Sequence, residues 1–109
     1  MDQLTNQMLN RRLEVDEMLI NIVGQKRLYF QPPASMKMQY PCIKYSRSNI
    51  ENSFANGKVY KQSHKYEIIV IDEDPDSVIV FEVSKIPGIK HDRHYESNNL
   101  NHDVFTLYY

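Results

Sequence analysis

The chain has 109 residues, of which 41% are hydrophobic and 25% are charged, the composition of one compact globular domain. This balance excludes a disordered tail, and no stretch approaches the roughly 20 apolar residues of a membrane span. Thirteen basic and fourteen acidic residues give a formal net charge of -1, which argues against nonspecific duplex binding as the main activity. The single cysteine, Cys42, cannot form an internal disulfide, so we expect folding in a cytoplasm. Residues 1–10 lack an apolar run of signal-peptide length, so we expect neither export nor a membrane anchor.

The first expected element is an amphipathic helix over residues 2–24. Apolar residues recur there at roughly helical spacing, and no proline interrupts them. Asp2 can cap the start of this helix, and Gly24 can close it in the left-handed conformation. A short strand over residues 27–31 follows, because two successive prolines stop it.

The middle of the chain predicts two further strands. Residues 40–45 form the first, and residues 59–72 form a long central strand that is apolar on both faces and therefore covered from both sides. The polar residues 46–58 between them predict an extended loop or loose hairpin rather than core, with Asn56-Gly57 as the turn signal.

For residues 78–86, the capping pattern and the residue propensities predict different secondary structures. Asp74, Pro75 and Asp76 have the order typical of a helix start: an N-cap, a first helical residue and an acid at the positive end of the helix dipole. The residues that follow are mostly β-branched and favour a strand. The capping pattern favours a second helix, which ends before Pro87.

The last part of the chain predicts a strand over residues 89–96, a turn at residues 97–99 and a final strand over residues 103–109. The expected fold is therefore α+β. An antiparallel or mixed sheet is packed by an N-terminal helix and a second short helix, in one domain of residues 1–109.

The acids of residues 72–76 are the first candidate for chemistry, because carboxylates at a strand end can hold magnesium for phosphoryl transfer. Their spacing also matches the start of a calcium loop. That loop would need glycine where Ser77 stands and a bidentate glutamate where Val83 stands. We favour a helix cap, which explains the acids without a metal.

The remaining candidates for catalysis are weak. His91 and His94 lie three residues apart on an expected strand, so they point to opposite faces and cannot share a zinc ion without a bulge. Cys42 lies in a strand pattern and is expected to be a small buried hydrophobe rather than a nucleophile. With only three glycines in the chain, no glycine-rich phosphate loop can form.

The aromatic and basic residues point to surfaces instead. The chain has eight tyrosines and no tryptophan, and tyrosine suits both the edge of a core and a subunit interface. Lys58, Lys61 and Lys65, with Arg47, form a local basic region. This region would either face DNA or protect a solvated strand edge.

An ordered set of segments carries a resemblance to a known family: LYFQPP (28–33), MQYPCIKY (38–45), FAN (54–56), Tyr60, VIDEDPDS (70–77) and NLNHDVFTLYY (99–109). The set resembles small virion proteins from phages of low-GC Gram-positive bacteria, which are similar to tail terminators of the head-tail junction, or neck, of long-tailed phages. The resemblance covers residues 27–109. The chain departs from it in a longer N-terminal helix and in the apolar residues 78–81.

The resemblance implies a structural protein with no catalytic residues, no cofactor and no metal. Tail terminators form a hexameric ring on the last ring of the tail tube, stop its elongation and dock the head-side connector. The expected partners are therefore further copies of this chain, the tail tube protein and the head-side connector or stopper, with genomic DNA in the lumen. The expected location is the virion, after synthesis in the bacterial host cytoplasm.

We expect heterologous contacts to close the ring, made by residues 46–58 and the C-terminal strand. The alternatives are a head-completion, stopper or minor capsid protein, a metal-dependent nuclease that uses the acids of residues 72–76, and a small nucleic-acid-binding regulator. The expected contact residues are Tyr45, Arg47, Phe54, Asn56, Lys58, Tyr60, Phe105, Tyr108 and Tyr109.

Overall fold

The computed structural model describes the backbone of residues 3–109 and the side chains of residues 9–109 except that of Tyr60. The fold is α+β, as predicted. No helix among the described residues combines the length and the apolar character needed to cross a membrane. The elements are α1 (Gln3–Val23), the 3-10 turn η1 (Gln25–Arg27), β1 (Leu28–Phe30), β2 (Cys42–Ala55), β3 (Lys58–Asp72), α2 (Val78–Ser84), β4 (Ile89–Ser97) and β5 (Leu100–Tyr108).

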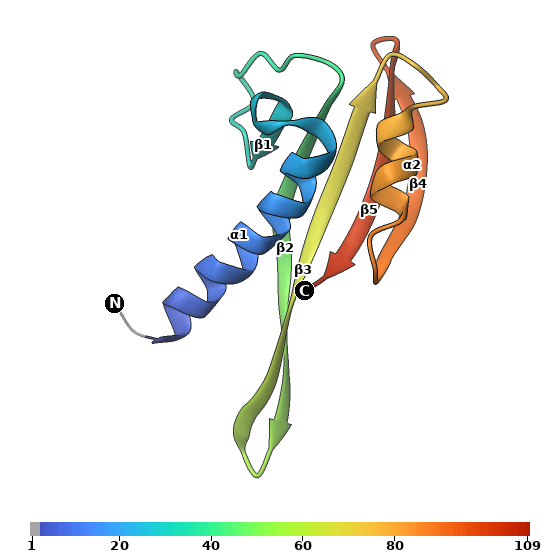
Figure 1. The fold of residues 1–109 in the computed structure, drawn as a ribbon. Helices are drawn as coiled ribbons and strands as arrows, with labels where there is room; N and C mark the ends of the chain where they lie inside the picture. Colours follow the sequence, from blue (N-terminus) through green and yellow to red (C-terminus); the bar gives the residue numbers. More distant parts are fainter. Residues whose placement is uncertain (1–2) are drawn as a thin grey trace.

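The strands form one five-stranded mixed sheet in the order β1-β2-β3-β5-β4. β1 pairs in parallel with β2, and every other neighbouring pair is antiparallel. Both helices cover the same face of this sheet, where Leu19 of α1 and Val83 of α2 join one core cluster (Figure 1). On the opposite face, Tyr29 and Met38 pack against a second, smaller core cluster.

The central strand β3 has apolar side chains on both of its faces. Ile68 and Val70 point to the helices, whereas Ile69 and Ile71 belong to the second cluster on the other face, with Cys42. Successive side chains of a strand point to opposite faces, so an unbroken apolar run is needed where both faces are covered. The prediction of a central strand covered from both sides is confirmed.

The end of α1 differs from the prediction. Gly24 has a positive φ of 88°, but its ψ of 152° is extended, so it does not adopt the left-handed helical conformation. Its N–H donates to the carbonyl of Ile20 at 2.8 Å and completes the last turn of α1. The chain then enters η1 directly. Asp2, the predicted cap of the helix start, lies outside the described residues.

The second helix is confirmed, but its predicted cap is wrong. α2 begins at Val78, and its N-cap is Ser77, whose hydroxyl accepts a hydrogen bond from the N–H of Val80 at 3.4 Å. The strand propensity of this stretch is overridden because Val83 is fully buried and Ile79 packs against the same cluster. One apolar stripe on a helix is enough to cover this part of the sheet.

The predicted cap residues Asp74, Pro75 and Asp76 form a turn before the helix instead. The carboxylate of Asp72 accepts the N–H of Asp74 at 3.0 Å, and the carboxylate of Asp74 accepts the N–H of Asp76 at 2.9 Å. Aspartate side chains readily make such local bonds to the backbone two residues on. The helix therefore starts only after these two turns have been completed.

The strand boundaries also shift. The predicted strand over residues 40–45 begins at Cys42, and that over residues 103–109 begins at Leu100. Asn98 and Asn99, with φ of 54° and 63°, make the tight turn before it. Of the two alternatives predicted for residues 46–58, the hairpin is correct and the extended loop is wrong, because β2 and β3 pair continuously up to a turn at Asn56-Gly57.

Candidate functional site

The β2–β3 hairpin projects from the body as an arm, which we define as residues 48–61. Every described side chain of the arm is exposed. The pairing of β2 with β3 extends along it to Ala55 and Lys58 at the tip. Figure 1 shows the arm pointing away from α2, β4 and β5, so neither helix nor the remaining strands cover its outer part.

Local sequence explains why the arm is a hairpin. Asn56 and Gly57 have φ of 53° and 76°, the combination that a two-residue turn of type I′ requires. At the root, the register shifts between Arg47 and Asn49, and a second shift lies between Ser53 and Phe54. Such irregularities bend a strand and increase its twist, so they change the direction in which the arm points.

Helix α1 and the C-terminal residue hold the root of the arm. The guanidinium of Arg11 in α1 donates to the carbonyl of Gln62 at 2.8 Å. Tyr109 and His64 exchange main-chain hydrogen bonds of 3.1 and 2.8 Å. The side chain of His64 is fully buried here, and burial lowers the pKa of its imidazole, assisted by the charges of Arg11 and Arg47.

The tip of the arm exposes apolar side chains. Phe54 is 65% exposed and its register partner Val59 is 52% exposed, while Ile50 lies nearer the root. A two-stranded hairpin without a packed face is only marginally stable in water. Packing of the tip against another surface would therefore bury its apolar side chains and stabilise the hairpin.

Most of the predicted contact residues are accessible. Phe54, Asn56 and Lys58 are exposed on the arm. Tyr108 and Tyr109 are 48% and 40% exposed at the end of β5. Arg47 is half-buried at the root of the arm, and the side chain of Tyr60 lies outside the described part of the structure.

Tyr45 and Phe105 are corrections to that set, because both are core residues. Tyr45 is 2% exposed, its ring packs between those of Phe30 and Tyr66, and its hydroxyl donates to Asp16. Phe105 is fully buried on the same face of the sheet. Neither side chain can contact a second subunit without opening the core.

A second surface feature is a groove of about 490 Å³ beside α2, which we call the α2 groove. Val78 and Phe81 line it and are 71% and 61% exposed. Asp76 and Asp103 add carboxylates. Phe81 is thus largely open to solvent, and the ammonium of Lys85 lies 4.3 Å from the centroid of its ring.

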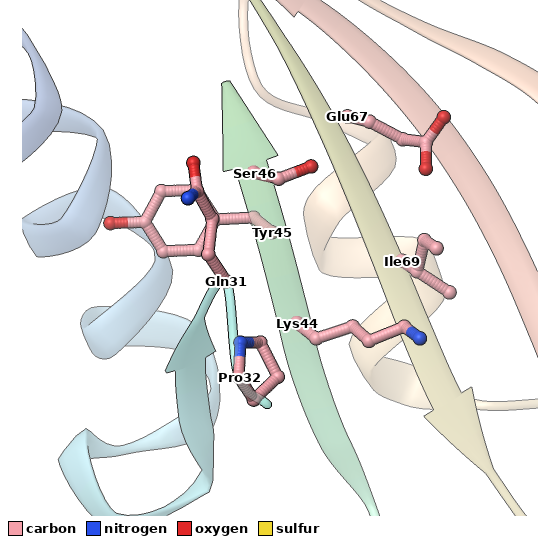
Figure 2. A pocket seen from close by; sticks show the side chains of 7 residues that line it. All are labelled: Gln31, Pro32, Lys44, Tyr45, Ser46, Glu67 and Ile69. Atoms are coloured by element: carbon pink, nitrogen blue, oxygen red, sulfur yellow. The ribbon is translucent and has the colours of Figure 1, made fainter. Parts of the chain in front are cut away.

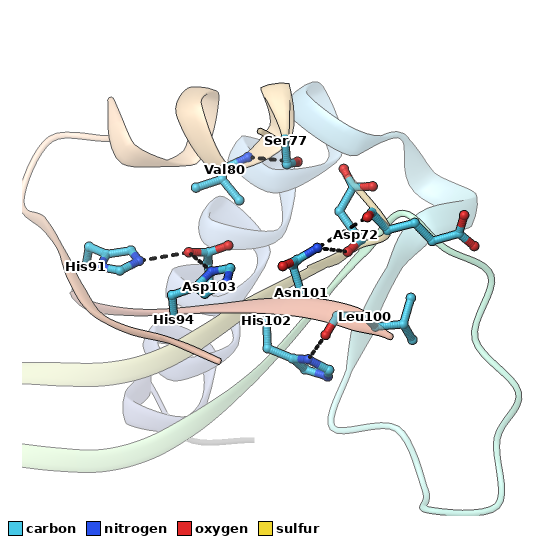
Figure 3. A network of polar contacts seen from close by, with 10 residues as sticks. Asp72, Ser77, Val80, His91, His94, Leu100, Asn101, His102 and Asp103 are labelled. Atoms are coloured by element: carbon cyan, nitrogen blue, oxygen red, sulfur yellow. Dashed lines mark hydrogen bonds and ion pairs between the residues drawn. The ribbon is translucent and has the colours of Figure 1, made fainter. Parts of the chain in front are cut away.

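The carboxylate of Asp103 is held by two imidazoles (Figure 3). Nε2 of His91 and Nδ1 of His94 each lie 3.0 Å from its Oδ1. The two histidines share a face because the register of β4 shifts between His91 and Arg93, which is the bulge that the sequence alone did not reveal. The expectation that they point to opposite faces is therefore wrong.

None of these groups makes a metal site. Among the described residues, no group of three or more histidine, cysteine, aspartate or glutamate side chains could hold a metal ion. The carboxylates of Asp72 and Asp74 accept backbone N–H groups in the turn before α2. The acidic stretch thus has a structural explanation in its own hydrogen bonds.

The opposite face of the sheet carries a smaller depression of about 210 Å³ (Figure 2). Lys44, Glu67 and Ile69 line it, and Lys44 lies beside its register partner Ile69. Cys42 belongs to the same face but is fully buried, and burial raises the pKa of its thiol to about 11. It is the small buried hydrophobe that the sequence predicts.

Within the described part of the chain, the arm and the α2 groove both expose apolar side chains that suit contact with a partner. The arm projects from the body and is apolar at its tip, whereas the α2 groove is a hollow with an apolar wall. Comparison with known proteins adds no assignment: no protein-family model matches this chain, and no curated protein matches its sequence.

Proposed function

We propose that this chain is a non-enzymatic structural subunit that assembles with copies of itself into a closed ring, and that the ring is a tail terminator in the neck of a long-tailed bacteriophage. The observation that carries the assembly role is the arm. Its outer residues are exposed, and its tip presents Phe54 and Val59 to water. A free monomer gains little from such a hairpin, whereas an assembly does.

The energetics favour burial of the tip against a protein surface. Removing a phenylalanine or valine side chain from water contributes about 1.5–3 kcal/mol. Phe54 and Val59 together therefore offer a few kcal/mol per contact. A ring repeats the contact around its circumference, so a weak single interface gives a stable assembly.

The phage assignment is supported by the ordered resemblance of residues 27–109 to neck proteins. In this proposal the ring caps the tail tube, ends its elongation and joins the tail to the head. Its partners are the tail tube protein on one side and the head-side connector or stopper on the other, with genomic DNA in the lumen. Its location is the virion.

Light scattering during size exclusion tests the assembly role. We expect a mass of a small whole number of chains, hexameric for a tail terminator, and rings in negative-stain images. Replacing Phe54 and Val59 by serine should shift the mass to that of a monomer. Replacing Met36, which is 47% exposed away from the arm, by serine is the matched control and should leave the ring intact.

Phage particles test the role in the neck. A phage that lacks this protein should make tails of irregular length that do not join heads. Cross-linking within complete particles separates a terminator, which contacts the tube protein, from a stopper, which contacts the head connector alone. Uniform tails joined to heads in the absence of the protein would show that it is no terminator.

A further inference from the structure

We propose that the arm of one copy docks into the α2 groove of the next copy. This inference rests on the ring assembly proposed above and names the surface that receives the arm. Three observations carry it: the matching apolar areas, the opposite charges of the two features, and their positions at opposite ends of the molecule.

The apolar areas match in kind. Phe54 at the arm tip and Phe81 at the groove wall are each more than half exposed, as are Val59 and Val78. The groove, at about 490 Å³, falls within the ~300–1,000 Å³ of pockets that enclose a small ligand. It is therefore large enough to take the ring of Phe54.

The charges of the two features are opposite. The arm carries Lys58 and Lys61 near its tip, against a single acid at Glu51. The groove begins where the acidic stretch ends, with Glu73 and Asp76 exposed. Opposite charges at the rim of an interface guide association and fix its register.

Basic side chains also lie beside the groove: Lys85, whose Nζ lies 4.3 Å from the ring centroid of Phe81, and the imidazoles of His91 and His94. Lys85 pairs with Glu82 on the outer turn of α2 at 3.3 Å, so these two charges offset each other. His91 and His94 bond to Asp103. The exposed acids at the start of α2 therefore provide most of the attraction for the arm.

The arm cannot reach the groove of its own chain. β3 begins with Lys58 at the arm tip and ends with Asp72 beside the acidic stretch. Fifteen strand residues span about 50 Å at ~3.3 Å each, which agrees with the longest dimension of the molecule, 51 Å. Figure 1 shows the arm at one end of β3 and the start of α2 near the other.

The occupant of the groove is therefore a second copy, in a head-to-tail contact. Because the two contacting surfaces are different parts of the chain, each copy uses its arm on one neighbour and its groove on the other. Such heterologous contacts form a closed ring when the rotation between neighbours closes. This is the arrangement that a ring-forming subunit needs.

Cross-linking between introduced cysteines tests the contact. The variant Ala55→Cys/Ser84→Cys places one thiol at the arm tip and one at the groove, and both positions are exposed. The native thiol of Cys42 is buried and should not compete. With a short bismaleimide, we expect a ladder of covalent multimers in a denaturing gel that ends at the ring number.

Each single-cysteine variant and the pair Ala55→Cys/Met36→Cys are the matched controls, and none should give a ladder. Rings of normal mass without a ladder in the first pair would overturn the docking inference and leave the ring proposal standing. A chain that remains monomeric in light scattering would overturn both.

Charge reversal gives a second test. Lys58→Glu/Lys61→Glu should raise the concentration needed for half assembly by about tenfold or more, because like charges then face each other. Adding Glu73→Lys/Asp76→Lys to the same chain should restore assembly to near the unmodified level. A combined variant that assembles no better than the lysine variant would contradict the proposed contact.

Discussion

The hydroxyl of Tyr45 donates to Oδ1 of Asp16 at 2.5 Å, which ties the middle of α1 to the second strand of the sheet. The ring of Tyr45 lies 4.9 Å from that of Phe30 and 6.3 Å from that of Tyr66, measured between centroids. Two interactions thus attach α1 to the sheet: the hydrogen bond of Tyr45, whose ring lies between two other aromatic rings, and the packing of Leu19 in the core.

Tyr45→Phe should therefore lower the free energy of unfolding by about 1.5 kcal/mol, because it removes a charge-assisted bond while keeping the ring. Urea unfolding followed by circular dichroism measures the change. Asp16→Asn is the matched partner and should cost less, since its amide oxygen can still accept the bond. A Tyr45→Phe variant as stable as the unmodified chain would mean that this bond contributes nothing.

The stability of the fold should decrease at acidic pH because of His64. Burial, and then the charges of Arg11 and Arg47, lower its pKa from 6.5, so the fold favours the neutral imidazole. This contribution is present above pH 6.5 and is lost as the pH falls through the lowered value. Urea unfolding at pH values between about 7 and 5 measures it.

The variant His64→Leu should weaken this acid dependence, because leucine has no group that takes up a proton. His102→Gln is the matched control. His102 is less buried and stacks on Tyr95, with ring centroids 4.6 Å apart. If the free energy of unfolding fell equally with pH in the unmodified chain and in His64→Leu, other groups would be responsible for the acid sensitivity.

Cys42 should be unreactive in the folded protein. Its thiol is fully buried and burial raises its pKa to about 11, so it is neither accessible nor ionised near neutral pH. We expect no labelling by a thiol reagent at pH 8 in buffer and complete labelling in urea. Rapid labelling of the native protein would show that β2 opens at its start.

α2 offers a paired test of core against surface. Val83 is fully buried and Phe81 is 61% exposed two residues earlier. Val83→Ala should lower the free energy of unfolding by about 2 kcal/mol through lost burial and a cavity. Phe81→Ser should leave the stability of the monomer nearly unchanged but reduce assembly, as read by light scattering. Equal losses of stability in both variants would contradict this division of α2.

The sequence predicts those elements that local chemistry determines. Residues 68–71 are predictable as a central strand because a run that is apolar on both faces must be covered on both faces. Asn56-Gly57 predicts the turn of the hairpin because both residues tolerate positive φ. The existence of α2 is also predicted, but from the acids at residues 74–76, whereas the residue that caps the helix is Ser77.

The features that could not be predicted depend on register between distant strands. Tyr45 and Phe105 look like interface aromatics until the pairing of β2, β3 and β5 sets which face each residue occupies. One irregularity in β4 turns His91 and His94 to the same side. A single sequence does not reveal where a strand gains an extra residue.

The two register shifts in the arm have a consequence for the solubility of the free chain. The outer edges of a hairpin carry unpaired N–H and C=O groups and invite sheet extension between molecules, which leads to aggregation. The shifts near Asn49 and Phe54 interrupt a flat edge, and Lys58 and Lys61 keep it charged. Acetylation of these lysines, or alkaline storage that neutralises them, should therefore promote fibrous precipitates from concentrated stocks.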